Sequence, residues 1–203
     1  MSQPSQPAAS LMERKRRLVE QRIIEAADEL FTANGFENVS VTDIAARADV
    51  GRTTFFRYFG DKSEVVFAKA QEMLDAIAEA AESGSFGAAG SASEAVRQLS
   101  PIVLDLCERA TSDPEGYERH LQLLERHLEL RGRDALKMQQ LAGKLSEVLT
   151  SRGTDEAIAI FAAQIALACY QTGKRRAASV RALTAETRAA FEQVLTLGAA
   201  RDR

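Results

Sequence analysis

Two short helical patterns separated by a tight break, over residues 41–58, constrain the fold of this chain more than any other feature of its sequence. Ser40 is followed three residues later by Asp43, a pair that resembles a capping box and predicts a helix start directly after Ser40. After the break the helical pattern resumes. We therefore predict one helix over residues 41–48 and a second over residues 52–58.

The break between these helices has the residue types that a close helix crossing needs. Ala45 supplies a small side chain at the crossing, and four residues later the backbone must turn, often with a positive φ. Asp49 stands at that turn and belongs to the few residue types besides glycine that tolerate the left-handed region. Ile44, Val50 and Phe55 are predicted to fill the small core between the two helices.

The flanking segments complete a helical head. Residues 14–34 carry an apolar stripe of helical periodicity that ends at an Asn-Gly pair, which is typical of a helix stop. Phe36 and Phe59 are predicted to seal the core of the head against this helix. Asp61 is a good N-cap for the next helix, which is predicted over Lys62–Glu82.

With its apolar positions buried, the second short helix presents an outward face made of Arg52, Thr53, Thr54, Phe56 and Arg57, with Tyr58 at its end. An α-helix fits the major groove of DNA, and a recognition helix reads base edges mostly from its N-terminal end. Arg52 can pair bidentately with guanine, and Thr54 offers a methyl group and a hydroxyl. Arg57, Tyr58 and Lys62 are placed for phosphates, which position the duplex without reading it. Each residue alone fits an ordinary surface helix, but the pattern favours DNA binding.

Three stretches together resemble the DNA-binding domain of the tetracycline-repressor (TetR) family: Phe31–Phe36, Val41–Ala45 and Thr53–Lys62. The resemblance covers about residues 17–66 and implies an all-helical dimer whose N-terminal helix-turn-helix binds operator DNA. The residues that it implies to face DNA are Thr42, Arg52, Thr53, Thr54, Phe56, Arg57, Tyr58 and Lys62. The chain departs from the family at Phe56, where tyrosine is usual, and at Gly51, where serine is frequent. The first departure removes one phenol-to-phosphate hydrogen bond.

The overall charge does not identify a nucleic-acid binder, because the formal net charge is −3 and such proteins are often basic. The run Arg14-Lys15-Arg16-Arg17 is the one basic cluster near the predicted head. A bare charge run is more often a solvated surface than a binding site. In the resembling family such an arm often reaches the DNA backbone or the minor groove, so both interpretations of this run stay open.

The rest of the chain predicts more helices. Residues 83–93 are rich in Gly, Ser and Ala and predict a loop. Helical patterns follow over Glu94–Ala110, Pro114–Leu130, Arg133–Ser151, Thr154–Gln171 and Thr184–Ala200. No strand pattern appears, so we predict an all-α chain of about nine helices. The predicted parts are a disordered tail (1–12), a DNA-binding domain (13–62) and a larger ligand-binding and dimerisation domain (63–203).

Two of these segments are candidates for a homodimer interface. Residues 154–171 are apolar nearly all round, which indicates burial on more than one side. Residues 184–200 carry a narrower apolar stripe. In the resembling family the last two helices pair with their twins, and a twofold operator requires two recognition helices. Burial within one subunit is the alternative.

The middle helices are predicted to enclose a small apolar or amphipathic effector. The candidate pocket residues are Phe67, Met73, Ile77, Leu99, Ile102, Leu106, Cys107, Tyr117, His120, Leu124 and Phe161. Each also fits an ordinary core position. His120 and His127 fit solvated edge residues, ligand contacts or a metal pair, but no third metal ligand accompanies them. Cys107 and Cys169 fit buried, reduced thiols.

No arrangement typical of an enzyme appears, and no cofactor motif or metal site is expected. The longest apolar run, Ala157–Tyr170, is too short to span a bilayer, and no signal peptide is apparent, so a cytoplasmic protein is expected. The sequence therefore predicts a ligand-responsive regulator, most simply a repressor released from DNA when its effector binds. An activator with the same head remains open, as does a helical ligand carrier or enzyme without sequence-specific DNA binding.

Overall fold

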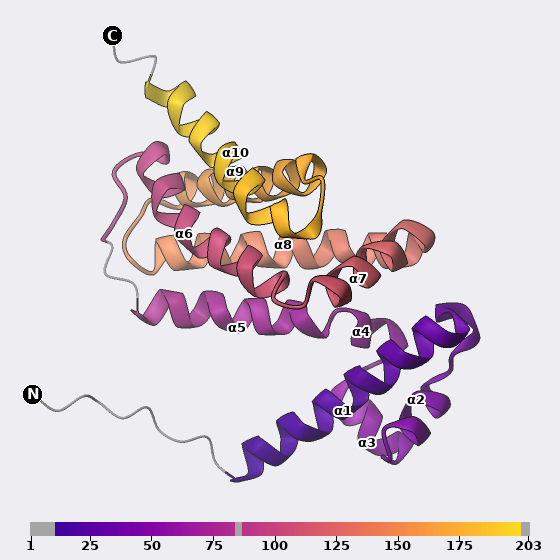
Figure 1. Cartoon of the computed structure of the whole chain (residues 1–203). Coiled ribbons are helices and arrows are strands. Elements are labelled where there is room, and N and C mark those ends of the chain that lie inside the picture. Colours follow the sequence, from indigo (N-terminus) through magenta and orange to yellow (C-terminus); the bar gives the residue numbers. More distant parts are fainter. Residues whose placement is uncertain (1–10, 84–86, 200–203) are drawn as a thin grey trace, which may run out of the picture. The chain divides into compact units, whose positions relative to one another are not determined.

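The computed structural model describes residues 11–83 and 87–199, which form helices joined by short connections (Figure 1). Within these ranges the chain has ten α-helices, two 3₁₀-helices and no strand, which confirms the all-α class; the sequence predicted about nine helices. Most of the predicted tail lies outside the described residues, and its last two positions belong to the first helix. The chain divides into two compact units, residues 1–68 and residues 69–203.

The elements of the first unit are α1 (Leu11–Asn34), η1 (Phe36–Asn38), α2 (Val41–Arg47), α3 (Arg52–Tyr58) and α4 (Lys62–Val66). Next along the chain come α5 (Ala68–Ser83), α6 (Ala92–Ala110), α7 (Pro114–Arg126), α8 (Leu128–Thr150), α9 (Glu156–Arg176), η2 (Val180–Ala182) and α10 (Leu183–Ala199). No helix among the described residues is both long enough and apolar enough to cross a bilayer.

Helix starts follow the capping residues. Ser40 and Asp43 form the predicted capping box, in which each side chain accepts from the other residue's backbone N–H. Asp61 caps α4 by accepting from the backbone N–H of Glu64, also as predicted. Asp113 caps α7, with a proline at the first helical position. These local signals explain why the predicted starts of α2, α4 and α7 agree with the structure.

Two helix predictions are wrong. The helix predicted over 62–82 is broken at Phe67, which separates α4 from α5. The helix predicted over 114–130 ends before His127, whose backbone is extended, and α8 then runs through Gly132, the predicted break. In one continuous helix Leu124 and Leu130 would point about 120° apart. With the break, both side chains are buried.

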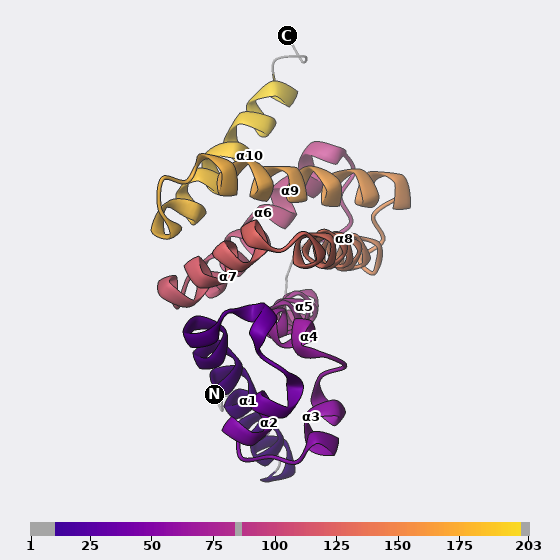
Figure 2. The same cartoon turned by 90° about the vertical axis from the view of Figure 1, so that its right-hand side faces the viewer.

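The second unit is organised around α9, which packs against α6, α8 and α10. Figure 2 views α8 nearly end-on and shows α9 running across it. The buried face of α9 consists largely of alanines, among them Ala159, Ala162, Ala163 and Ala166. Small side chains let the neighbouring helices approach closely, so α9 forms the centre of this unit's core.

The closest approach in this unit is between α9 and α10. Gly173 was predicted to lie beyond its helix but is inside α9, buried against Thr187 of α10. A Cβ at Gly173 would lie 2.7 Å from the backbone N and Cα of Thr187. Thr187 is itself fully buried, and the Cys107 thiol donates to its hydroxyl at 3.8 Å. The two helices therefore depend on glycine at this position.

Replacing Gly173 by Ala should lower the free energy of unfolding of this unit by about 1–3 kcal/mol, because the backbone of α10 must shift to admit the methyl group. Gly132→Ala is the matched control: no atom lies within 4 Å of its Cβ position. In that open helical site alanine should add about 0.5–1 kcal/mol of stability. Urea denaturation measures the free energy of unfolding of both variants. An equal change in the two would contradict the close packing of α9 against α10 at Gly173.

Candidate nucleic-acid interface

The predicted helix-turn-helix is present in α2 and α3. Ile44 and Phe55 are fully buried between the helices, and Ala45 is 2 % exposed at their crossing. Asp49 has a φ of 53°, the left-handed conformation that its position predicts, and the Val50 backbone N–H donates to the Ala45 carbonyl at 2.9 Å. The turn and its core thus agree with the sequence prediction.

Arg22 of α1 holds this turn in place, and the sequence analysis did not single it out. Its guanidinium donates to the Asp49 carbonyl at 2.9 Å and also to the Ala48 carbonyl. The same group lies 3.6 Å from the Asp49 carboxylate. No local signal identifies this contact, because Arg22 and its partners are more than 25 positions apart in the chain. Arg22 therefore fixes the end of α2 to α1.

The outward face of α3 is free of the core, as predicted. Arg52, Thr53 and Arg57 are exposed, and Thr54 and Tyr58 are half-buried. Phe56 is 48 % exposed, which is unusual for a large apolar ring.

Two aromatic rings restrain the arginines on this face. The Arg52 guanidinium lies 6.0 Å from the centre of the Phe56 ring, and the Arg57 guanidinium lies 5.7 Å from the Tyr58 ring. Thr42, a candidate outside α3, is exposed near the start of α2. The head therefore presents two oriented cations beside hydroxyl and aromatic groups.

Lys62 does not have the predicted outward orientation. Its ammonium donates to the backbone carbonyls of Phe36, Glu37 and Val39 at 2.7, 3.4 and 3.0 Å. It also lies 4.4 Å from the centre of the Phe36 ring. Because an ammonium has three protons, these carbonyls use its whole donor capacity. Lys62 thus joins the start of α4 to the segment that precedes α2, which corrects its expected role as a phosphate contact.

Lys62→Met should lower the free energy of unfolding of the first unit by about 1–3 kcal/mol, because it leaves carbonyls without their charged donor. Lys15→Met provides the control, since Lys15 is exposed on α1 and should change stability by less than about 0.5 kcal/mol. Thermal and urea denaturation followed by circular dichroism measure both effects. A Lys62 variant as stable as the control would restore this side chain as a candidate phosphate contact.

The candidate pocket residues are dispersed. Seven are buried in the second unit: Ile77, Leu99, Ile102, Leu106, Cys107, Tyr117 and Leu124. Phe67 is buried but belongs to the first unit, and Phe161 is 56 % exposed on α9. Met73 and His120 are half-buried. Burial raises the pKa of the Cys107 thiol to about 11, so this thiol is protonated at neutral pH.

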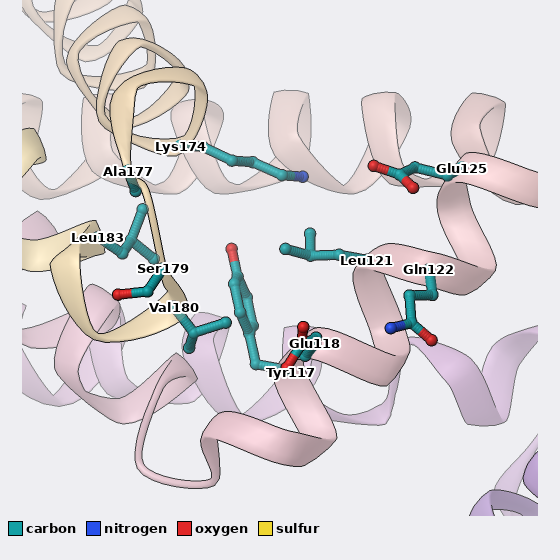
Figure 3. A pocket seen from close by; sticks show the side chains of 10 residues that line it. All are labelled: Tyr117, Glu118, Leu121, Gln122, Glu125, Lys174, Ala177, Ser179, Val180 and Leu183. Atoms are coloured by element: carbon teal, nitrogen blue, oxygen red, sulfur yellow. The ribbon is translucent and has the colours of Figure 1, made fainter.

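A cleft of about 310 Å³ lies between α7 and the chain from the end of α9 to the start of α10 (Figure 3). Of the candidate pocket residues, only Tyr117 lines it. Its hydroxyl lies 3.1 Å from that of Tyr170. Burial raises the pKa of both phenols, so each is a neutral hydrogen-bonding group at neutral pH.

Comparison with known proteins identifies the first unit. Residues 23–68 match the family model of bacterial regulatory proteins, tetR family. A protein of Mycobacterium tuberculosis described as a regulator of mycofactocin biosynthesis, MftR, is 38 % identical over 78 residues, 35 % of this chain and 39 % of its own length. The HTH-type transcriptional regulator TcmR of Streptomyces glaucescens is 37 % identical over 81 residues, 40 % of this chain and 35 % of its own length. The matched segment thus spans well under half of either relative.

A solved structure extends the likeness to the fold of the whole chain. A transcriptional regulator of the TerR/AcrR family from Aquifex aeolicus is 16 % identical, with a TM-score of 0.53, over 87 % of this chain and 99 % of its own. At that identity the likeness concerns the fold alone. The first unit has a helix-turn-helix fold, and the part of it that matches a family model resembles bacterial regulatory proteins. Residues 23–68 of this chain are thus similar to bacterial regulatory proteins of the tetR family.

Proposed function

We propose that this chain is a transcriptional regulator that binds a pseudo-palindromic operator as a dimer, and that it acts as a repressor released by a small molecule. The observation that carries the proposal is the exposed face of α3, which stands on the fully buried ring of Phe55. A helix anchored in this way presents its outward side chains in fixed positions. Such rigidity is what base readout in a groove requires.

The residues of α3 have two proposed roles: some contact base edges and others contact phosphates. Arg52, in the first turn of α3, is placed for bidentate pairing with guanine. Thr54 offers its methyl group to thymine or its hydroxyl to another base. Arg57 and Tyr58, at the other end of α3, are placed for phosphates. Phe56 has no hydroxyl, so it contributes apolar contact and restrains Arg52.

The dimer interface is proposed on α9 and α10. Between the exposed charged residues at its two ends, α9 has solvent-facing residues that recur at helical spacing: Ala157, Ile160, Phe161, Gln164, Ala168 and Gln171. Ile160 and Phe161 are 50 % and 56 % exposed, and Leu197 of α10 is 75 % exposed. Large apolar side chains among small and uncharged ones are typical of the centre of a homodimer interface. This face also supports the predicted pairing of the last two long helices.

Ligand release is proposed as two-state linkage. An effector can shift the dimer away from operator DNA only if it binds the DNA-incompetent state more tightly. Because linkage is reciprocal, operator DNA must then weaken effector binding by the same factor.

DNA binding is tested by capture of genomic fragments on the purified full-length chain, followed by sequencing. We expect enrichment of a short palindrome by the wild-type chain and its loss in the Thr54→Ala/Arg57→Ala double variant, with at least about tenfold weaker binding. The control is Thr32→Ala/Arg131→Ala, which removes the same residue types from exposed positions outside α3.

Enrichment that the control keeps and the α3 variant loses would support the regulator. A folded dimer that enriches no sequence at low salt would overturn the proposal and favour the ligand-carrier or enzyme alternative. The position of the palindrome relative to promoters, together with a reporter assay, separates repression from activation.

Dimerisation is tested separately by Phe161→Glu, which places a charge in the proposed apolar interface. We expect this variant to sediment as a monomer at micromolar concentration while the wild-type chain sediments as a dimer. Leu128→Glu is the control, since Leu128 is 75 % exposed on α8, outside the proposed interface. A Phe161 variant that remains dimeric would exclude this part of α9 from the interface.

A further inference from the structure

The cleft beside α7 has two kinds of lining residue, which together indicate the chemistry of its ligand. Its apolar lining consists of Leu121, Val180 and Leu183, together with the ring of Tyr117. Its charged side chains are Glu118 and Glu125 of α7 and Lys174 of α9. An apolar wall beside a few charged groups favours a small amphipathic molecule, and about 310 Å³ is at the small end of ligand pockets.

The charges in the cleft do not balance. Lys174 is the single cation in the lining, and its ammonium lies 3.9 Å from the Asp134 carboxylate behind it. Figure 3 shows the Lys174 side chain extending along the cleft toward Glu125. The Asp134 carboxylate thus already pairs with this ammonium, and with Glu125 ahead of it a carboxylate from a ligand would meet negative charge on both sides.

Glu118 is the carboxylate of the lining toward which Lys174 does not extend (Figure 3). It lies on the far side of Leu121 from Glu125, next in sequence to Tyr117, and it is exposed. Within the described ranges neither Glu118 nor Glu125 takes part in an ion pair within 4.0 Å. The Tyr117 ring also lines the cleft and is next in sequence to Glu118, and an aromatic face near a carboxylate is a favourable environment for an ammonium group.

We propose that this cleft binds a small amphipathic cation, an alkylammonium or a related amine, with its charged end against Glu118 and its apolar body against Leu121, Val180 and Leu183. At the other end of the cleft Lys174 pairs with Asp134 and extends toward Glu125, so this end disfavours an anion. The inference deepens the proposed function by naming the chemistry of its effector. The binding of the cation is measured without DNA. A chain that binds no cation but still binds an operator would therefore contradict this inference and leave the proposed function intact.

The site is tested by isothermal titration of the full chain with three probes that each carry a six-carbon chain: hexyltrimethylammonium, hexanol and hexanoate. We expect saturable binding of the cation at one site per chain, and at least about tenfold weaker binding of the neutral and anionic probes. Equal affinity for hexanoate, or no saturable binding of the cation, would overturn the proposal.

Substitution locates the site. Glu118→Gln should weaken binding of the cation by about fivefold, the upper range for a partly exposed charge pair. Glu115→Gln is the matched control, because Glu115 is exposed on the same helix, pairs with Arg119 at 4.0 Å and does not line the cleft. If the two variants bind hexyltrimethylammonium with equal affinity, the cation does not bind against Glu118. Both glutamates are exposed, so neither substitution is expected to disturb folding.

Discussion

The left-handed turn at Asp49 is the constraint on which the geometry of the head depends. It sets the angle between α2 and α3, and so decides which residues of α3 are buried and which are exposed. A non-glycine residue in this conformation costs about 1 kcal/mol, which the rest of the head must offset. Arg22 does so by binding two carbonyls of the turn and facing the Asp49 carboxylate. The outward face of α3 is therefore positioned from α1.

The two units use different kinds of packing. In the first unit aromatic rings fill the core of a small head, with Phe31 and Phe36 centred 5.1 Å apart and Phe55 and Phe59 5.9 Å apart. In the second unit α9 brings alanines and Gly173 against its neighbours, so the helices themselves come close. Large rings give a small domain enough buried area, whereas small residues make close helix contacts that admit few substitutions.

The sequence was most informative where structure is local. The capping box at Ser40, the turn at Asp49 and the start of α3 depend on residues a few positions apart, and all three were predictable. The break at His127 was not, because no glycine or proline marks it and it exists so that Leu124 and Leu130 can both be buried. The roles of Arg22 and Lys62 were missed for the same reason, since their partners are more than 20 positions away. The cleft combines side chains from α7 and α9 with the connection to α10, which helical periodicity cannot bring together.

The position of the cleft gives the proposed effector a specific route to the dimer. One of its sides is α7, and the other is the chain that joins α9 to α10. If the cleft binds the effector and α9 and α10 form the dimer interface, as proposed, the ligand contacts the connection between these two helices. At Gly173 and Thr187 the backbones of α9 and α10 lie close together. One helix therefore has little room to move toward the other at this point. A ligand that shifts the connection is therefore expected to move α9 and α10 together and alter how two copies pair. The spacing of two recognition helices depends on that pairing, so effector and operator would be coupled through the dimer.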